Sequence, residues 1–398
     1  MSDMEGARLP SHLYVHVPFC ASKCSYCDFA SISGASDEIV RTVFTGIRTQ
    51  LTTWSRSALD GVLDTVYVGG GTPSRYPEQV AEVLERVYSN FVVHPHAEVT
   101  AEANPDSLDA EVAHVFSAAG VTRISVGVQS FDDSVLRLLG RRHDAAAAWA
   151  ACRAVTDARL DLSIDLICGV PGQTITSWSE TLERAASTGA RHVSVYPLSI
   201  EEGTPLSVAI GGGLIGEPDH DVAADMMLLA TNVLGYHALS RYEVANYAED
   251  RAHESIHNTA YWTGRQYIGV GPSAHGMLDA ATARAIGMLD IEREGVARVR
   301  YGNARDIDEW LVGKGDTYET LSAEEAGRED VMLGLRLVRG VPAGQVEQAG
   351  LTGVLESLAG EGLTELVAPT GGGGPRWRTT ERGWLLGNEV FGRIWGAE

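Results

Sequence analysis

The sequence predicts an α/β fold, in which six βα units form a partial barrel and a mostly helical, winged-helix-like domain follows at the C-terminus. Short β-rich runs alternate with amphipathic helical stretches up to about residue 205, and several runs alternate polar with apolar residues. Helical runs from about residue 322 predict the second domain. A chain of 398 residues is long enough for one large and one smaller domain.

The predicted elements follow one another in the order that a parallel sheet requires. The predicted strands are residues 13–19, 65–71, 98–104, 123–130, 162–170 and 192–200. The predicted helices, with apolar residues at three- and four-residue spacing, are residues 37–54, 78–90, 107–119, 144–158 and 176–188. Six such units indicate a partial barrel.

Period-two alternation divides these strands into an apolar and a polar face. In the fifth run Leu162 and Ile164 are expected to face helices, while Ser163 and Asp165 point inward. An ordinary closed barrel fills its interior with Val, Ile and Leu. Inward polar groups are costly without partners, so the pattern predicts water or a polar ligand inside. The alternative is a solvated antiparallel sheet with polar edges.

Four regions are predicted. Residues 1–12 form a flexible N-terminus, 13–205 the barrel core, 206–321 an extension, and 322–398 the C-terminal domain. The extension has a helix-like run at 222–235, and residues 252–276 are dense in His, Tyr, Trp and Gly. The last 78 residues hold seven Arg, no Lys and eleven acidic residues, which does not suit a DNA-binding surface. We interpret this domain as a packing or lid module.

Composition excludes several classes of protein. The net charge of −22 and the pI near 4.9 disfavour nucleic acid and anionic membrane surfaces as partners. Neither a signal peptide nor an integral membrane segment is visible, and five cysteines do not suggest a disulfide framework. We expect a cytoplasmic protein with reduced thiols.

Three of the cysteines lie within eight positions directly after the first strand: Cys20, Cys24 and Cys27. Three thiolates on a four-iron cluster leave one iron open for chemistry. The alternative is a structural zinc site that adds His16 or His12. The other two cysteines, Cys152 and Cys168, are predicted to be small buried hydrophobic residues.

The cysteine loop resembles the CxxxCxxC signature of radical S-adenosylmethionine (SAM) enzymes, including the aromatic Tyr26 before the third cysteine. The glycine run at 69–73 closes the second strand and resembles the family's motif for the SAM amino group. The resemblance implies a radical SAM barrel with a [4Fe–4S] cluster on the three cysteines. It implies SAM contacts from Tyr14, Tyr26, Gly70, Gly71, Thr72, Glu102, Gln129, Arg141 and Asp165.

The residues themselves agree with this assignment, because the C-terminal ends of strands in a βα barrel meet at one opening. An inward Asp165 needs a partner such as Arg141, and the alternative for that pair is an internal ion pair without function. We assign no catalytic residue.

The chain is similar over nearly its whole length to oxygen-independent coproporphyrinogen III oxidases and to their relatives, the HemW-type heme chaperones. The oxidases carry an additional cysteine where this chain has Phe29, and a long N-terminal segment where only 12 residues precede the first strand. The chaperone motif HNxxYW is instead matched by His257, Asn258, Tyr261 and Trp262.

A histidine can ligate heme iron, and Tyr and Trp offer flat apolar area to a porphyrin. We expect His257 to be the ligand, with His275 and His253 as alternatives, or else a buried histidine that caps a turn. The resemblance implies a protein that binds the cluster, SAM and heme and delivers heme to an acceptor protein. The alternatives are oxidative decarboxylation of coproporphyrinogen III through a 5′-deoxyadenosyl radical, and RNA modification, which the acidic charge disfavours.

Overall fold

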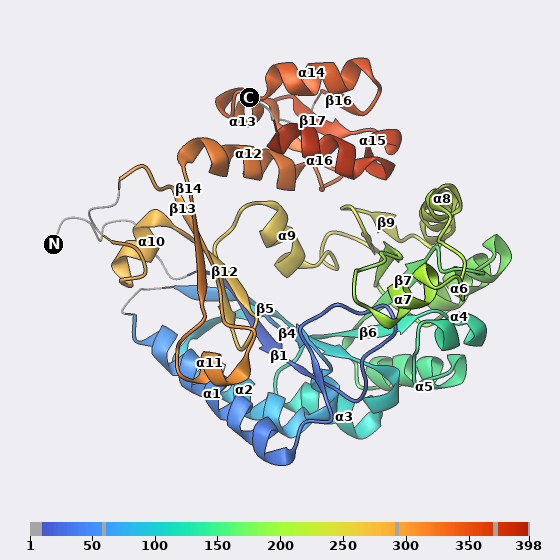
Figure 1. Ribbon diagram of the computed structural model, residues 1–398, viewed down its shortest axis with the longest axis vertical. Coiled ribbons are helices and arrows are strands. Elements are labelled where there is room, and N and C mark those ends of the chain that lie inside the picture. Colours follow the sequence, from blue (N-terminus) through green and yellow to red (C-terminus); the bar gives the residue numbers. More distant parts are fainter. Residues whose placement is uncertain (1–9, 58–60, 291–293, 369–372, 397–398) are drawn as a thin grey trace.

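The computed structural model describes residues 10–57, 61–290, 294–368 and 373–396 (Figure 1). Six parallel strands form the centre of its main sheet, in chain order: β1 (His12–Val17), β4 (Val62–Gly70), β5 (Val92–Ala103), β6 (Arg123–Gln129), β7 (Asp161–Cys168) and β8 (His192–Pro197). The predicted α/β partial barrel is therefore confirmed. Residues 1–9 of the predicted flexible N-terminus lie outside the described residues, and His12 already belongs to β1.

The five predicted helices form close to their expected bounds and cover the outer face of the sheet (Figure 1). They are α1 (Asp37–Ser55), α2 (Pro77–Asn90), α3 (Ala110–Ala118), α5 (Ala145–Asp157) and α6 (Ile175–Ser187). Side chains of Ser36, Asp109, Asp144 and Thr174 accept N–H groups of the first turn of four of them. A short helix between β6 and α5, α4 (Asp133–Leu138), was not predicted.

The region 206–321 adds strands to both edges of the same sheet, an arrangement that was not predicted from the sequence. At one edge β11 (Tyr267–Val270) pairs in parallel with β1, and an antiparallel meander follows it: β12 (His275–Asp279), β13 (Arg298–Gly302) and β14 (Thr317–Leu321). At the other edge lie β10 (Asn246–Ala248) and β9 (Ser240–Arg241). The helices are α7 (Pro205–Gly211), α8 (His220–Tyr236), α9 (Ile256–Trp262), α10 (Ala280–Ala285) and α11 (Ile307–Leu311).

The C-terminal region has its own hydrophobic core and a three-stranded sheet. Its elements are α12 (Ala323–Gly334), β15 (Val341–Pro342), α13 (Ala343–Gln348), α14 (Thr352–Gly360), β16 (Thr364–Val367), β17 (Arg376–Thr379), α15 (Glu381–Leu385) and α16 (Gly387–Trp395). The helices α13 and α14 are separated at Gly350, whose φ of 71° ends α13. No helix in the described ranges has the length and apolar character needed to cross a membrane.

The polar and apolar faces of the central strands are arranged as predicted. Ile124 and Val126 of β6 are fully buried in the main hydrophobic core. Arg123, on the opposite face of the same strand, forms a buried ion pair with Glu98 of β5. The interior of the barrel is therefore a hydrogen-bonded polar layer, and α9 lies on its open side (Figure 1).

Candidate cofactor site

The cysteine loop leaves the sheet at the C-terminal end of β1 and is fixed by backbone contacts. Cys20 ends the short strand β2 (Phe19–Cys20), which pairs with β3 (Ile32–Ser33). Ser25 in the loop donates its N–H to Leu139 O (3.1 Å) and its hydroxyl to Leu138 O (2.9 Å) at the end of α4. Cys20, Cys24 and Cys27 are unpaired and partly exposed.

Two donors reach the sulfur atoms of this loop. Thr72 Oγ1 lies 3.5 Å from the Sγ atom of Cys20, and Arg141 Nη1 lies 3.3 Å from that of Cys24. Burial raises the pKa of Cys27, and the two neighbouring thiols raise it further. Hydrogen bonds to sulfur are among the groups that tune an iron–sulfur cluster. The loop therefore brings three thiols together and supplies donors to two of them, an arrangement that suits ligands to separate iron atoms of one cluster.

The zinc alternative does not fit this geometry. Both ring nitrogens of His16 are engaged, with Tyr14 OH (2.8 Å) and with Ala30 O (2.9 Å). His12 begins β1, at the other end of that strand from the cysteine loop, and bonds Thr65 Oγ1 (2.9 Å). Among the described residues, no three His, Cys, Asp or Glu side chains are arranged around a single metal ion.

The glycine run allows the end of β4 to lie against the cysteine loop. Gly70 has a φ of 108°, and a Cβ atom there would overlap the imidazole of His16. Gly71 donates its N–H to Val17 O (2.8 Å), and Thr72 donates its N–H to Phe19 O (2.7 Å). The glycines therefore allow the end of β4 to pack closely against β1 and β2, besides leaving space for a ligand.

Glu102 lies at the end of β5 beside Gly70. Its carboxylate accepts the Gly70 N–H (2.9 Å) and the Tyr67 hydroxyl (2.8 Å). Burial raises the pKa of Glu102 to about 7, although both hydrogen bonds favour the ionised form. A bound cation at this position would favour the ionised carboxylate further.

The predicted partner of Asp165 is corrected by the structure. Asp165 accepts the Ser125 hydroxyl at 3.2 and 3.1 Å, and burial raises its pKa. Arg141 does not pair with it; the guanidinium donates to Asn104 Oδ1 (2.6 Å) and to Gly127 O (2.7 Å), besides the cysteine loop. Asn104 was not proposed as a site residue, although it is the last residue on the polar face of the third predicted strand, 98–104.

Gln129 ends β6 in an uncommon conformation. Its φ is 66°, and the pairing of β6 with β7 shifts register just before it. A non-glycine residue in this region of φ stores strain that surrounding structure must support, and such residues gather at functional sites. Gln129 therefore stands at the strand ends with Glu102, as the sequence predicted. The aromatic Tyr26 packs in a small apolar cluster with Leu139, and its side chain is hydrogen-bonded to Arg141.

The HNxxYW segment forms α9, and its histidine is buried. His257 is 2% exposed, with Nδ1 bonded to Thr65 Oγ1 (2.7 Å) and Nε2 to Tyr261 OH (2.9 Å). Its ring stacks on Tyr67 with centroids 5.1 Å apart. Trp262 donates its indole N–H to Glu243 (2.8 Å). The structure therefore does not present His257 as a free iron ligand, and it is Tyr261 of this motif that lines a cavity.

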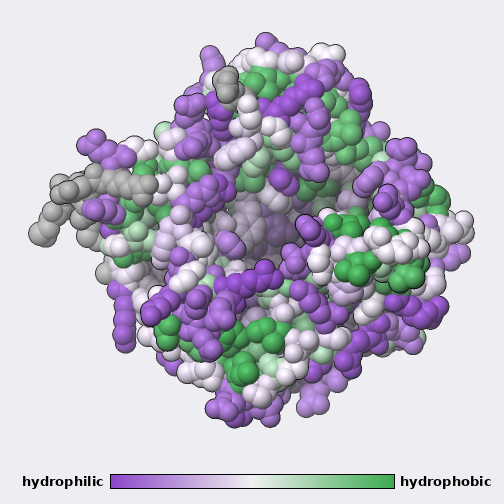
Figure 2. All heavy atoms as spheres, in the orientation of Figure 1, coloured by the Kyte–Doolittle hydropathy of each residue, from purple (hydrophilic) through white to green (hydrophobic). Residues whose placement is uncertain are grey.

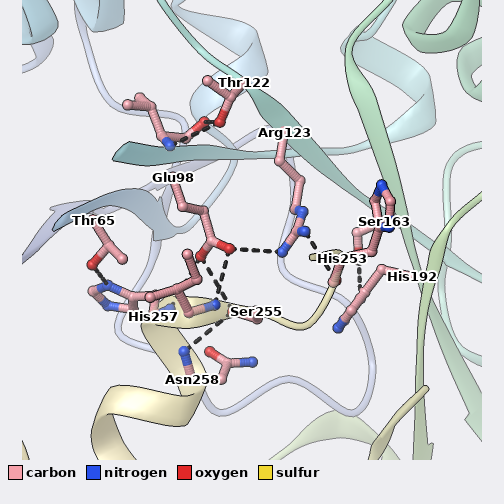
Figure 3. A network of polar contacts seen from close by, with 12 residues as sticks. Thr65, Glu98, Thr122, Arg123, Ser163, His192, His253, Ser255, His257 and Asn258 are labelled. Carbon is pink, nitrogen blue, oxygen red and sulfur yellow. Dashed lines mark hydrogen bonds and ion pairs between the residues drawn. The ribbon is translucent and has the colours of Figure 1, made fainter. Parts of the chain in front are cut away.

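A buried polar network fixes the start of α9 (Figure 3). Glu98 accepts the N–H groups of Ile256 (3.0 Å) and His257 (3.1 Å), the Ser255 hydroxyl (3.4 Å) and a guanidinium N–H of Arg123 (2.9 Å). Arg123 also donates to the carbonyl of the neighbouring His253 (3.0 Å). Glu98 and Arg123 were not selected from the sequence, but both lie on the predicted polar strand faces.

One cavity of about 480 Å³ joins several predicted site residues to residues that the sequence did not single out. The space-filling view shows the molecule hollowed at its centre, beside the position of α9 (Figure 2). The predicted residues on its wall are Tyr14, Gly70, Glu102, Tyr261 and the alternative ligand His275. Others are His16, Asp28, Phe29, Ala30, Tyr267, Ser273, Asn303 and Arg305.

Comparison with known proteins identifies the family. The Radical SAM superfamily model matches residues 14–185. A heme chaperone HemW from Mycobacterium tuberculosis is 34% identical over 400 residues, covering 97% of this chain and 95% of that protein. The chain belongs to the HemW family of radical SAM proteins. A HemW from Bacillus subtilis is 31% identical, covering 96% of this chain and 98% of its own length.

Membership of this superfamily implies a [4Fe–4S] cluster and SAM as cofactors of the HemW fold. The mouse protein "Radical S-adenosyl methionine domain-containing protein 1, mitochondrial" is 40% identical over 282 residues, and this chain spans only 62% of its length. Coproporphyrinogen III oxidase (HemN) from Escherichia coli, a radical SAM enzyme, has a TM-score of 0.76 at 20% identity, covering 98% of this chain and 91% of that chain. The likeness to HemN is one of fold.

Proposed function

We propose that the chain is a heme chaperone, which holds a [4Fe–4S] cluster through Cys20, Cys24 and Cys27, binds SAM and heme, and delivers heme to an acceptor protein. The observation that carries the proposal is the similarity to heme chaperones over 97% of the chain. A cavity beside the cysteine loop, with aromatic side chains on its wall, supports it. The five unpaired cysteines also support a cytoplasmic location.

The proposed SAM site lies at the strand ends next to the cysteine loop. A cluster bound by three thiolates leaves one iron open to a further ligand. Glu102 and the backbone of Gly70 form one side of the space, and Gln129 stands on the neighbouring strand. The remaining proposed contacts are Tyr14, Tyr26, Gly71, Thr72, Arg141 and Asp165. Of these, Thr72 and Arg141 act on the cysteines directly.

The proposed heme site uses the other wall of the same cavity. Phe29 is 67% exposed and Tyr267 and Tyr261 are partly buried, so flat apolar area faces the cavity. Phe29 occupies the position at which the oxidases carry an additional cysteine, so this chain lacks that thiol. His257 and Trp262 have a positional role in the proposal, because their side chains bond Thr65, Tyr261 and Glu243 and so hold α9 in place, while Asn258 contributes its backbone N–H to Ser255 at the start of the helix.

The test is a titration of the anaerobically reconstituted protein with ferric heme, followed by absorbance in the Soret region. The same preparation is assayed for conversion of coproporphyrinogen III with SAM and a reductant. We expect one heme bound per chain and no protoporphyrinogen. Porphyrinogen turnover without heme binding would instead assign the chain to the oxidases.

A further inference from the structure

We propose that His275 is the axial ligand of the heme iron and that Arg305 binds a porphyrin propionate in the same cavity. This inference rests on the proposed heme-binding function and deepens it. Neither residue belongs to the HNxxYW motif. Three features of the cavity support the assignment: an imidazole with free ring nitrogens, a fixed backbone that carries it, and a nearby cation without an ion-pair partner among the described residues.

Ligation of iron requires a ring nitrogen that is not already committed to the protein. His257 is buried and bonds Thr65 and Tyr261 through its two nitrogens. His253 bonds Asp250 (2.7 Å) through Nδ1 and Arg191 (2.8 Å) through Nε2. His16, which reaches the cavity, also has both nitrogens engaged.

His275 differs from these histidines in each respect. It is exposed, it lines the cavity, and its ring has no hydrogen-bond partner among the described residues. Its antiparallel partner is Gly302 of β13, where a Cβ atom would lie only 2.8 Å from the Cε1 atom of His275. The glycine therefore leaves the imidazole the space that it occupies.

The turn that carries His275 is fixed by the surrounding structure. Asn303 donates its side-chain N–H to Gly271 O (2.7 Å), and Gln50 accepts the Gly271 N–H (2.9 Å). Ser273 lies in this turn with a φ of 61°, a conformation that such contacts must support. A ligand side chain on a supported backbone is positioned before the ligand arrives.

Arg305 follows β13 and lines the same cavity as His275. Its guanidinium is exposed and forms no ion pair within the described part of the chain. In a chain with a net charge of −22, an unpaired arginine beside a cavity is available to an anionic ligand. Guanidinium pairs with carboxylates through two parallel hydrogen bonds, and heme carries two propionates.

Two probes separate the roles of these residues. Ferric heme and iron-free protoporphyrin IX share the ring and the propionates, but only heme takes an axial ligand. His275→Ala should weaken heme binding about tenfold or more and shift the Soret band, while protoporphyrin binding stays as in the parent. Added imidazole should restore the parent spectrum. Arg305→Gln should weaken both probes by about tenfold, and this effect should disappear with the propionate dimethyl esters.

The matched controls are His220→Ala and Arg86→Gln, both of exposed residues outside the cavity, which should leave both probes unchanged. If the parent binds heme and His275→Ala keeps its spectrum and affinity, the axial assignment is overturned and the proposed function stands. The propionate assignment would be overturned if Arg305→Gln bound the free acids as tightly as the parent does, or if the parent bound the dimethyl esters as tightly as the free acids. A parent protein that binds neither probe would overturn the proposed function and this inference together.

Discussion

Glu98→Ala should release α9 from the sheet, because this one carboxylate holds both the start of the helix and a buried guanidinium (Figure 3). The Glu98 and Arg123 side chains are each 6% exposed, and their charged atoms lie 2.9 Å apart. In the variant Arg123 stays buried and keeps the carbonyl of His253 as its partner. Two backbone N–H groups at the start of α9 also lose their acceptor.

The expected magnitude follows from burial. Removing one partner of a buried ion pair costs about 3 to 5 kcal/mol, and the lost N–H contacts are part of the same network and do not simply add. If this energy is lost from the local opening of α9, its helical amides should exchange with solvent about 100-fold faster or more, since about 1.4 kcal/mol is a factor of ten. Replacing Glu98 and Arg123 together with apolar residues should recover most of the protection.

The assay is hydrogen–deuterium exchange by mass spectrometry on peptides that cover α9. The control is Glu82→Ala, which removes an ion pair of similar length, 2.6 Å to Arg48, with Glu82 57% exposed. This exposed pair should contribute less than about 1 kcal/mol and leave α9 unchanged. Parent-like exchange of α9 in Glu98→Ala, or equal effects of the two substitutions, would refute the argument from burial.

Replacing any one of the three cluster cysteines by Ala should lower the iron and sulfide content of the reconstituted protein from about four each per chain. The control Cys168→Ala should leave this content unchanged. A metal analysis of an anaerobic preparation that finds one zinc and no iron would contradict the cluster. Gly70→Val should abolish SAM binding in a titration, because the side chain strains a positive φ and displaces His16; parent-like binding would show that SAM lies elsewhere. Burial raises the pKa of Glu243 from 4.5 to about 7, so the folded state favours the neutral carboxyl, and its stabilising effect is lost as pH rises from 4.5 through 7. Glu243→Gln should therefore gain about 2 to 3 kcal/mol of unfolding free energy over the parent between pH 5 and pH 8 in denaturant titrations, and a constant difference would contradict the shifted pKa.

The barrel could be predicted because its information is local. Period-two alternation in β6 and three- to four-residue spacing in α1 each identify an element from its own residues. The pairing of β11 with β1 could not be predicted in this way. Tyr267 and His12 are neighbours in the sheet but lie more than 250 positions apart in the sequence, and β11 has only four residues. A short strand gains its identity from the edge that it joins.

The positions of several site residues could be predicted from the sequence, but their hydrogen-bond partners could not. The resemblance to radical SAM enzymes implied Glu102 and Gln129, and the pattern agreed because it placed both residues at strand ends that share one opening. The partner of Arg141 depends instead on where Asn104 and the carbonyl of Gly127 lie, which the pattern does not contain. The period-two alternation of β7 correctly placed Asp165 on the inner face. Its hydrogen-bond partner is the hydroxyl of Ser125 on the neighbouring strand β6, where a charged partner, Arg141, was expected.

The histidines show why a recognisable motif and a ligand site need not be the same residues. A side chain that positions a helix must have its polar atoms satisfied, because an unsatisfied buried group is costly. His257 meets that requirement through Thr65 and Tyr261. A side chain that ligates a metal must keep a nitrogen free and open to the cavity, as His275 does. One imidazole can meet both requirements only if it keeps one of its two nitrogens free. His257 uses both nitrogens within the protein, so the motif contributes Tyr261 to the wall of the cavity, and His275 is the histidine that we assign to the iron.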